Sequence, residues 1–282
     1  MQTGGELDRL FSLRLYAGNS RVSDKFKIAI RNKRGRGNRC ERPLGLLALV
    51  QIMKKILFVA FFILVSVLSA DDEPGFIPLF NGVDLDGWDS KPGAWEVRDG
   101  EIWCTGASEE RNWIIWRGGE PSDFVLRLEF RWDEGNSGVQ VRSDDLGEWQ
   151  VFGYQVEVAR QKVMGLWHHS LIEKEHPKRE ARFLMTTAGE RAIIAEDGTR
   201  ENTKLEETAK IQSHYNENEW NTMEIIATGD MVIQKINGVH FATVIDQDSE
   251  MSRAQGLIAF QDHGKGCIVA FRNIRLKETA SK

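Results

Sequence analysis

Residues 231–244, with the sequence MVIQKINGVHFATV, show most directly how this chain folds. Two runs rich in Val, Ile and Phe flank the dipeptide Asn237-Gly238. Asn-Gly tolerates the positive φ angles of a two-residue turn, so the pattern predicts a β-hairpin. A second hairpin is predicted at residues 94–104, where Asp99-Gly100 joins two shorter runs.

Short strand patterns continue on both sides of these hairpins. Residues 124–132 alternate apolar and polar, which is typical of a half-buried antiparallel strand. Other short runs of this kind are residues 139–142, 154–158, 220–227, 257–260 and 268–276. Many short strands without intervening helices predict an all-β fold, a two-sheet antiparallel sandwich or jelly roll. The polar stretch 173–212 is predicted to be a long excursion with one short helix.

Charge divides the chain into two unlike regions. Residues 1–52 contain eleven Lys or Arg against four acids, whereas residues 71–282 contain 24 basic against 38 acidic residues. An acidic folded region repels phosphate backbones, so nucleic acid is not expected as a partner. We interpret residues 1–52 as a disordered extension or a mis-assigned start.

A secretory signal is predicted at residues 53–70. Met53-Lys54-Lys55 precedes an apolar run that is too short to span a bilayer comfortably, followed by small residues and an acidic start. We therefore expect export to the periplasm or the outside, no stable membrane association after cleavage, and a folded domain at residues 75–278. The alternative is a membrane anchor behind a basic cytoplasmic tail.

Two of the three cysteines, Cys104 and Cys267, lie in the predicted exported region. A pair in an oxidising compartment is compatible with a disulfide, although a sequence does not show proximity. Without a CxxC pattern, a structural zinc site is not indicated.

The strand at residues 154–158 is the most informative polar segment. Its period of two puts Gln155 and Glu157 on one face and its apolar residues on the other. Glu157 is then either a solvated edge charge or part of a cleft. Asp262-His263 follows another apolar strand, and a His beside an Asp can act as a general acid or base.

Nine tryptophans all lie in the predicted domain. Indole faces pack well on sugar rings, but tryptophan on strands also fills cores, which is the simpler explanation for most of them. Trp149 and Trp167 flank the polar strand and are the expected exceptions. The adjacent His168 and His169 point to opposite faces if they lie on a strand, so at most one belongs to a site.

The sequence LFNGVDLDGW at residues 79–88 resembles the opening signature of the 3-keto-disaccharide hydrolase domain family. Further blocks follow in that family's order: residues 95–102, 123–130, 135–139, 153–157, 219–221, 237–239, 261–264 and 271–276. The resemblance covers about residues 75–278. It implies a concanavalin-like jelly roll, similar to laminin-G domains, and hydrolysis of 3-keto-glycosides, disaccharides whose C3 hydroxyl has been oxidised.

A ketone at C3 acidifies the hydrogen on C2, so a base can remove it and the C1 aglycone can leave by elimination, with water adding afterwards. This route needs a base, an acid and an electrophile for the enolate. On the resemblance, Glu157 and His263 are predicted as base and acid in an unassigned order, with Asp262 orienting His263. The predicted residues that bind the carbohydrate substrate are Asn136, Arg142, Gln155, Trp149, Trp167 and His169. No cofactor is assigned, and a divalent metal held by carboxylate and imidazole is an alternative electrophile.

One segment departs from the family pattern. Many members carry Gly-(Gly/Ala)-(Ile/Leu)-Tyr where residues 164–169 are MGLWHH, so the tyrosine is missing and His168 or His169 is its candidate substitute. Two other functional classes stay open. A non-catalytic glycan-binding module is the main alternative, because fold does not fix function. A purely structural exported protein ranks last, because the polar strand residues are regularly placed.

Overall fold

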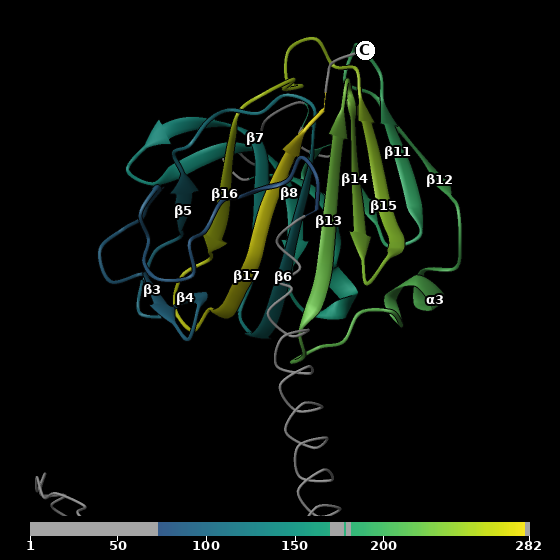
Figure 1. Cartoon of the computed structure of the whole chain (residues 1–282). Coiled ribbons are helices and arrows are strands. Elements are labelled where there is room, and N and C mark those ends of the chain that lie inside the picture. Colours follow the sequence, from purple (N-terminus) through teal and green to yellow (C-terminus); the bar gives the residue numbers. More distant parts are fainter. Residues whose placement is uncertain (1–72, 170–177, 179–181, 280–282) are drawn as a thin grey trace, which may run out of the picture. The chain divides into compact units, whose positions relative to one another are not determined.

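Antiparallel pairing between strands far apart in the sequence builds two β-sheets, which lie face to face (Figure 1). The computed structural model describes residues 73–169, 178 and 182–279. The predicted extension and the predicted signal peptide lie outside this range. In the described part of the chain, no helix has both the length and the apolar composition needed to cross a membrane.

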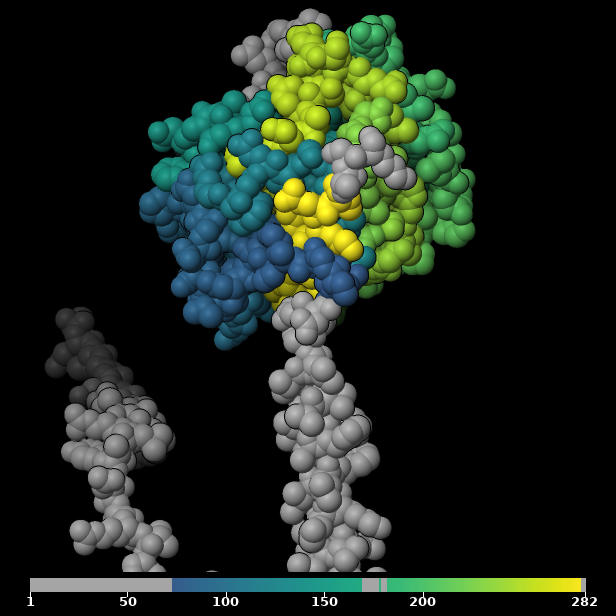
Figure 2. All heavy atoms as spheres, turned by 45° about the horizontal axis from the view of Figure 1, so that its top comes forward, coloured from purple at the N-terminus to yellow at the C-terminus, as the bar shows by residue number. Residues whose placement is uncertain are grey.

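The larger sheet has ten strands. Nine of them follow one another in this order: β12 (Arg200–Lys204), β11 (Glu190–Ile194), β15 (Val239–Asp246), β14 (Met231–Ile236), β13 (Asn221–Thr228), β6 (Phe124–Glu134), β17 (Ile268–Glu278), β4 (Glu101–Cys104) and β3 (Trp95–Arg98). The tenth, β1 (Ile77–Pro78), pairs with β17. Figure 2 shows this pairing as the blue start of the described chain lying against the yellow last strand.

The smaller sheet has seven strands. Their order is β10 (Thr186–Thr187), β9 (Gly165–His169), β8 (Gln150–Val158), β7 (Ser137–Gly147), β16 (Leu257–Asp262), β5 (Asn112–Trp116) and β2 (Trp88–Asp89). The inner faces of both sheets supply one continuous apolar core. Across this core the rings of Phe260 on β16 and Phe271 on β17 stack with centroids 4.1 Å apart. The predicted all-β, two-sheet sandwich is confirmed.

The turns and alternation expected from the sequence are also confirmed. Both hairpin turns adopt positive φ at both central residues, 50° and 80° at Asp99-Gly100 and 50° and 78° at Asn237-Gly238. On β6 the side chains alternate between buried and half-exposed up to Phe130, as a strand with one face on the core requires.

The prediction for residues 173–212 needs correction. Its second part contains β10, β11 and β12 besides the expected short helix, α3 (Thr208–Gln212). β11 joins the larger sheet by parallel pairing with β15, and β12 is exposed along almost its whole length. A polar strand at a sheet edge has little apolar alternation, which is why the sequence pattern missed it.

A β-bulge at Arg142 and Ser143 bends strand β7. Arg142 has a φ of 48°, and the register with β8 shifts between Val141 and Asp144. Beyond the bulge, the tip of the β7–β8 hairpin reaches β5, where the Trp113 amide donates to the Trp149 carbonyl at 3.0 Å. The bulge therefore turns the far end of this hairpin toward the opposite edge of the smaller sheet.

Gly153 is required by this bend. A Cβ atom there would lie 2.7 Å from Ser143 Cα and 2.8 Å from the Arg142 carbonyl oxygen, which are backbone atoms that cannot rotate away. Gly153→Ala is expected to cost about 2–3 kcal/mol in the free energy of unfolding, measured by urea denaturation. Gly119→Ala, where an added Cβ would have its nearest neighbours 3.8 Å away, is the control and should stay within about 0.5 kcal/mol of wild type. Equal effects of both changes would contradict this account.

Candidate functional site

A row of buried polar side chains lies on the face of β8 that points away from the core. Gln155 and Glu157 are each 2% exposed, whereas Tyr154, Val156 and Val158 belong to the core cluster. Gln155 Nε2 donates to Glu157 Oε2 at 2.7 Å and to Gln261 Oε1 on β16 at 3.1 Å. The predicted division of this strand into an apolar and a polar face is confirmed.

Gly138 makes this row possible. It lies on β7, between β8 and β16, and is the register partner of Glu157. A Cβ on Gly138 would come within 2.5 Å of Gln155 Cγ and 2.6 Å of its Cδ. The missing side chain leaves the space in which Gln155 crosses β7 to reach Gln261.

A pocket of about 400 Å³ opens beside Glu157, where the β6–β7 turn, the end of β8 and the 3₁₀ helix η1 (Gln161–Val163) meet. Its lining consists of Trp132, Gly135, Asn136, Glu157, Ala159, Arg160, Val163 and Trp167. Three residues singled out from the sequence, Asn136, Glu157 and Trp167, thus line one cavity. Their roles in binding or catalysis stay predictions.

Burial dominates the electrostatics of Glu157. It raises the pKa of the carboxyl to about 8, against the weaker opposing effect of hydrogen bonds from Gln155 and Asn136. The group is therefore largely protonated at neutral pH. Asn136 Oδ1 is buried without a hydrogen-bond partner among the described residues, so it is available to accept a bond from a ligand.

Arg160 is the other ionisable residue in the described lining. It is exposed, and none of the ion pairs found among the described residues involves it. With Glu157 protonated, the described lining carries a net positive charge.

Arg142 does not lie in this pocket. It is 1% exposed, and its guanidinium donates to the carbonyls of Ser122 and Gly229 and to Asp123 Oδ1 at 2.6–3.0 Å. Strict alternation along β7 would place Arg142 on the same face as Gln140, but the bulge turns its side chain toward these carbonyls. Arg142 thus stabilises the bend and lies outside the described pocket lining, a position that gives no support to its predicted contact with the substrate.

Trp149, Asp262 and His263 are also placed outside the described pocket lining. Trp149 is half-buried near the hairpin tip, where its Nε1 donates to Asp89 Oδ1 at 2.8 Å. Asp262 accepts from Asn112 Nδ2 and from the Gly264 amide, both at 2.9 Å, and neither partner is His263. His263 is exposed beyond the end of β16. The expected Asp–His pair is therefore not formed through these bonds.

His168 points into the core, opposite to Trp167. It is 1% exposed, and its ring makes edge contacts with Phe152 and Tyr154 at centroid distances of 4.7 and 5.4 Å. Burial lowers the pKa of its imidazole to about 3, so His168 is neutral and does not replace a catalytic group in the pocket. His169 ends β9, but its side chain lies outside the described part of the structure.

Trp132 and Arg160 line the pocket without having been singled out from the sequence. Trp132 was counted as an apolar residue of its strand, and it becomes accessible only because β6 ends two residues later. Arg160 lies shortly after the polar strand. Its position three residues after Glu157 was the one feature of the sequence that could have indicated it as a pocket residue. Neither position stands out from spacing alone.

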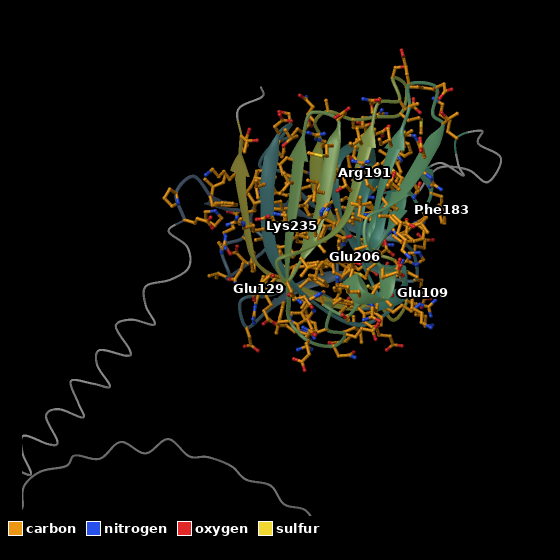
Figure 3. The ribbon with its side chains drawn as sticks, turned by 90° about the vertical axis from the view of Figure 1, so that its right-hand side faces the viewer. Glu109, Glu129, Phe183, Arg191, Glu206 and Lys235 are labelled. Atoms are coloured by element: carbon orange, nitrogen blue, oxygen red, sulfur yellow. The ribbon has the colours of Figure 1, made fainter. Side chains whose placement is uncertain are left out.

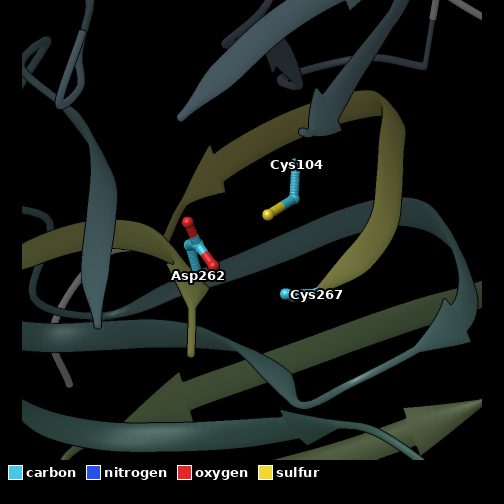
Figure 4. A group of neighbouring side chains, drawn as sticks. All are labelled: Cys104, Asp262 and Cys267. Atoms are coloured by element: carbon cyan, nitrogen blue, oxygen red, sulfur yellow. The ribbon is translucent and has the colours of Figure 1, made fainter. Parts of the chain in front are cut away.

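The described lining of the pocket does not supply the carboxylate and imidazole of the alternative metal-bound electrophile. Its described lining has one carboxyl, Glu157, and no imidazole. Among the described residues, one group has donor atoms spaced for a metal ion: Cys104, Asp262 and Cys267 (Figure 4). These three residues do not line the pocket.

A second cavity, of about 250 Å³, lies on the outer face of the larger sheet, where Figure 3 labels Glu129 and Lys235. Its charges are paired across strands. Glu224 accepts from Arg127 Nε at 2.7 Å and from Lys235 Nζ at 2.8 Å. We do not assign a function to this cavity.

Comparison with known proteins gives the family. No curated protein matches the sequence significantly. Similar solved structures include a candidate glycosyl hydrolase from Parabacteroides distasonis, with 19% identity, a TM-score of 0.47, and coverage of 72% of this chain and 99% of that chain. Another is the carbohydrate-binding module CBM66 from Bacillus subtilis, with 12% identity, a TM-score of 0.42, and coverage of 68% of this chain and 96% of that chain. A galectin-like protein of unknown function from the same organism has 11% identity, a TM-score of 0.44, and coverage of 73% of this chain and 96% of that chain.

The family model for 3-keto-alpha-glucoside-1,2-lyase-like domains matches residues 75–277, which is almost the whole described domain. The resemblance seen in the sequence blocks is thereby confirmed. The chain belongs to the family of 3-keto-alpha-glucoside-1,2-lyase-like domains.

Proposed function

We propose that the pocket beside Glu157 cleaves glycosides whose C3 hydroxyl has been oxidised to a ketone, beginning with removal of the proton on C2. The observation that carries this proposal is the pKa of about 8 of a buried carboxyl that lines a cavity between two tryptophans. Proton abstraction beside a carbonyl needs a base whose pKa lies near the working pH. A carboxylate with a raised pKa is a stronger base for this step than an ordinary exposed glutamate.

One carboxyl is sufficient for the proton transfers of the elimination. Glu157 in its ionised form takes the C2 proton, and the C–H electron pair becomes the enolate of the C3 ketone. The enolate collapses to a C1=C2 double bond and expels the aglycone oxygen, which receives a proton, in the simplest case from Glu157. Water then adds to the enone to give the 3-keto sugar. Ordinary glycosidases need two carboxylates on either side of the bond, whereas the described lining offers one.

Arg160 is the cation available for the enolate. A positive charge on the developing oxyanion lowers the barrier only if the cation is not already neutralised, and Arg160 has no ion-pair partner among the described residues. Gln155 has a different role. Its bonds to Glu157 and Gln261 fix the orientation of the carboxyl, so it is a positioning residue.

Trp132 and Trp167 would hold the sugar. Their indole nitrogens already donate to the carbonyls of Gly135 at 3.1 Å and Val163 at 3.3 Å. The ring of Trp167 also meets Phe183 edge to face at 5.1 Å between centroids. Indoles fixed in this way present apolar surface to the C–H groups of a pyranose ring.

A non-catalytic glycan-binding module is the second candidate. The aromatic residues favour it, because they would serve a lectin equally well. The buried, neutral carboxyl supports the enzyme, since a binding module gains nothing from desolvating a group that prefers water.

The test is the full chain incubated with 3-keto-trehalose or with trehalose, followed by assay of released glucose. We expect release from the keto sugar alone. Glu157→Gln should lower kcat by at least about 100-fold, because the amide keeps the shape of the neutral carboxyl but cannot accept the proton. Glu201→Gln, an exposed acid on β12, is the control and should keep full activity. A folded protein that binds the keto sugar without releasing glucose would support the binding module instead.

The raised pKa of Glu157 also predicts a pH-dependent stability difference. The folded pKa of about 8 lies above the ordinary value of 4.5, so protonated Glu157 stabilises the fold at low pH and this contribution is lost as pH rises toward 8. Wild type should lose about 1.4 kcal/mol per pH unit relative to Glu157→Gln between about pH 5 and pH 7.5. Urea unfolding of both proteins measures it, and other titrating groups cancel in the difference. A constant difference across this range would refute the desolvated carboxyl.

Binding of the sugar should depend on Trp167 and not on Trp149. In the Glu157→Gln background, which prevents turnover, Trp167→Ala should weaken binding of 3-keto-trehalose roughly tenfold by calorimetry, because the ring face that packs on the sugar is lost. Trp149→Ala removes an indole that is bonded to Asp89 outside the pocket, and should leave the affinity unchanged. The reverse order of effects would move the sugar to the hairpin tip.

A further inference from the structure

Three buried side chains that are far apart in the sequence meet inside the domain (Figure 4). Cys104 is the last residue of β4, Cys267 directly precedes β17, and Asp262 ends β16. One ligand atom from each, the two Sγ atoms and a carboxylate oxygen, lie within 4.8 Å of one another. The three residues are at most 1% exposed, and both cysteines are free in this structure.

Cys267 packs against the turn that lines the pocket. Its Sγ donates to the carbonyl of Asn136 at 3.2 Å. Gly135 lies so close that an added Cβ would be 2.8 Å from Cys267 Cα. Cys267 therefore packs directly against the β6–β7 turn, whose Gly135 and Asn136 line the pocket.

The chemistry of the three groups does not favour a metal ion. The hydrogen bond between the two cysteines, together with burial, raises the pKa of the Cys104 thiol above its ordinary value. The group offers three ligand atoms among the described residues, one fewer than the four that close a structural zinc site. Asp262 is also already bonded to Asn112 and to the Gly264 amide. A covalent bond between the thiols needs neither charge nor space for an ion.

We propose that Cys104 and Cys267 close into a disulfide when the chain folds in an oxidising compartment, and that this bond fixes the Gly135-Asn136 turn behind the pocket. The two thiols lose two protons and two electrons. An exchangeable disulfide, on a thiol oxidoreductase or a small molecule of that compartment, accepts them and becomes two thiols. The two Sγ atoms lie within 4.8 Å of each other, and the disulfide requires them to approach to about 2 Å. Formation belongs to folding, since thiols this deeply buried are not accessible in the finished domain.

The position of the bond explains its use. Asn136 supplies a hydrogen bond to Glu157 and an unpartnered acceptor, so a shift of its turn would alter both the pKa of Glu157 and the ligand contacts. β4 and β17 are adjacent strands, but only Ala270 and Phe271 pair with β4, and both lie beyond Cys267. The bond would hold the beginning of β17 where the backbone ladder does not. Its effect on turnover rests on the proposed function, whereas its existence does not.

The first test is disulfide mapping of the full chain, produced with export to a bacterial periplasm. The protein is denatured and alkylated with or without prior reduction, and its peptides are analysed by mass spectrometry. We expect the Cys104 and Cys267 peptides to be linked, and to be alkylated only after reduction. Alkylation of both thiols without reductant would overturn the proposal. So would a stoichiometric bound metal, measured by elemental analysis, together with free thiols.

A thermal test keeps the inference independent of catalysis. Wild type that has been unfolded, reduced and refolded with reductant should melt roughly 5–15 °C below the oxidised protein. Cys267→Ser should melt near the reduced protein and should not respond to reductant. Equal melting of oxidised and reduced wild type would overturn the proposal even if the variant fails to fold. If wild type contains the disulfide but releases no glucose from the keto sugar, only the proposed function is contradicted.

Discussion

The packing of the two inner sheet faces is the constraint on which the other features depend. Phe260 stacks on Phe271 across the core, with Trp88 stacked on Phe260 at 5.0 Å, and this contact fixes which face of β16 and β17 is inside. Because side chains alternate along a strand, Gln261 must then point outward when Phe260 points inward. The same rule on β8 places Gln155 and Glu157 on the outward face because Val156 faces the core. The position of the candidate site therefore follows from hydrophobic packing.

An outward face is normally wet, yet these polar residues are almost fully buried. Gly138 permits this, because its missing side chain lets Gln155 lie flat across β7 and bond to both neighbours. The amide network compensates part of the cost of removing Glu157 from water, and the rest is expressed as the raised pKa of its carboxyl. A stabilising substitution at Glu157 would be easy to find, and the presence of a carboxyl there is consistent with its use for chemistry.

Period and turn chemistry made several features predictable from the sequence. The sequence predicted both hairpins, the polar face of β8 and the sandwich, because Asn-Gly, Asp-Gly and strict alternation act locally. Prediction failed where a local break changes the direction of the chain. Arg142 fits the alternation, but a positive φ turns it toward Ser122 and Gly229. Trp132 and Arg160 line the pocket because of where β6 and β8 end. The adjacency of Cys104 and Cys267 depends on the long-range pairing of β17 with β4.

The β6–β7 turn contacts both the core and the pocket. On one side its Asn136 carbonyl accepts from Cys267 in the core, and on the other its side chain meets Glu157 in the pocket. A rigid turn is needed more by an enzyme than by a lectin, since transition-state stabilisation depends on donors and acceptors held in place before the reaction, whereas sugar binding tolerates small adjustments. Tryptophans alone would suit either function. A desolvated carboxyl, an arginine with no ion-pair partner among the described residues and a turn packed against the core are features that proton transfer would use and that sugar binding alone does not require.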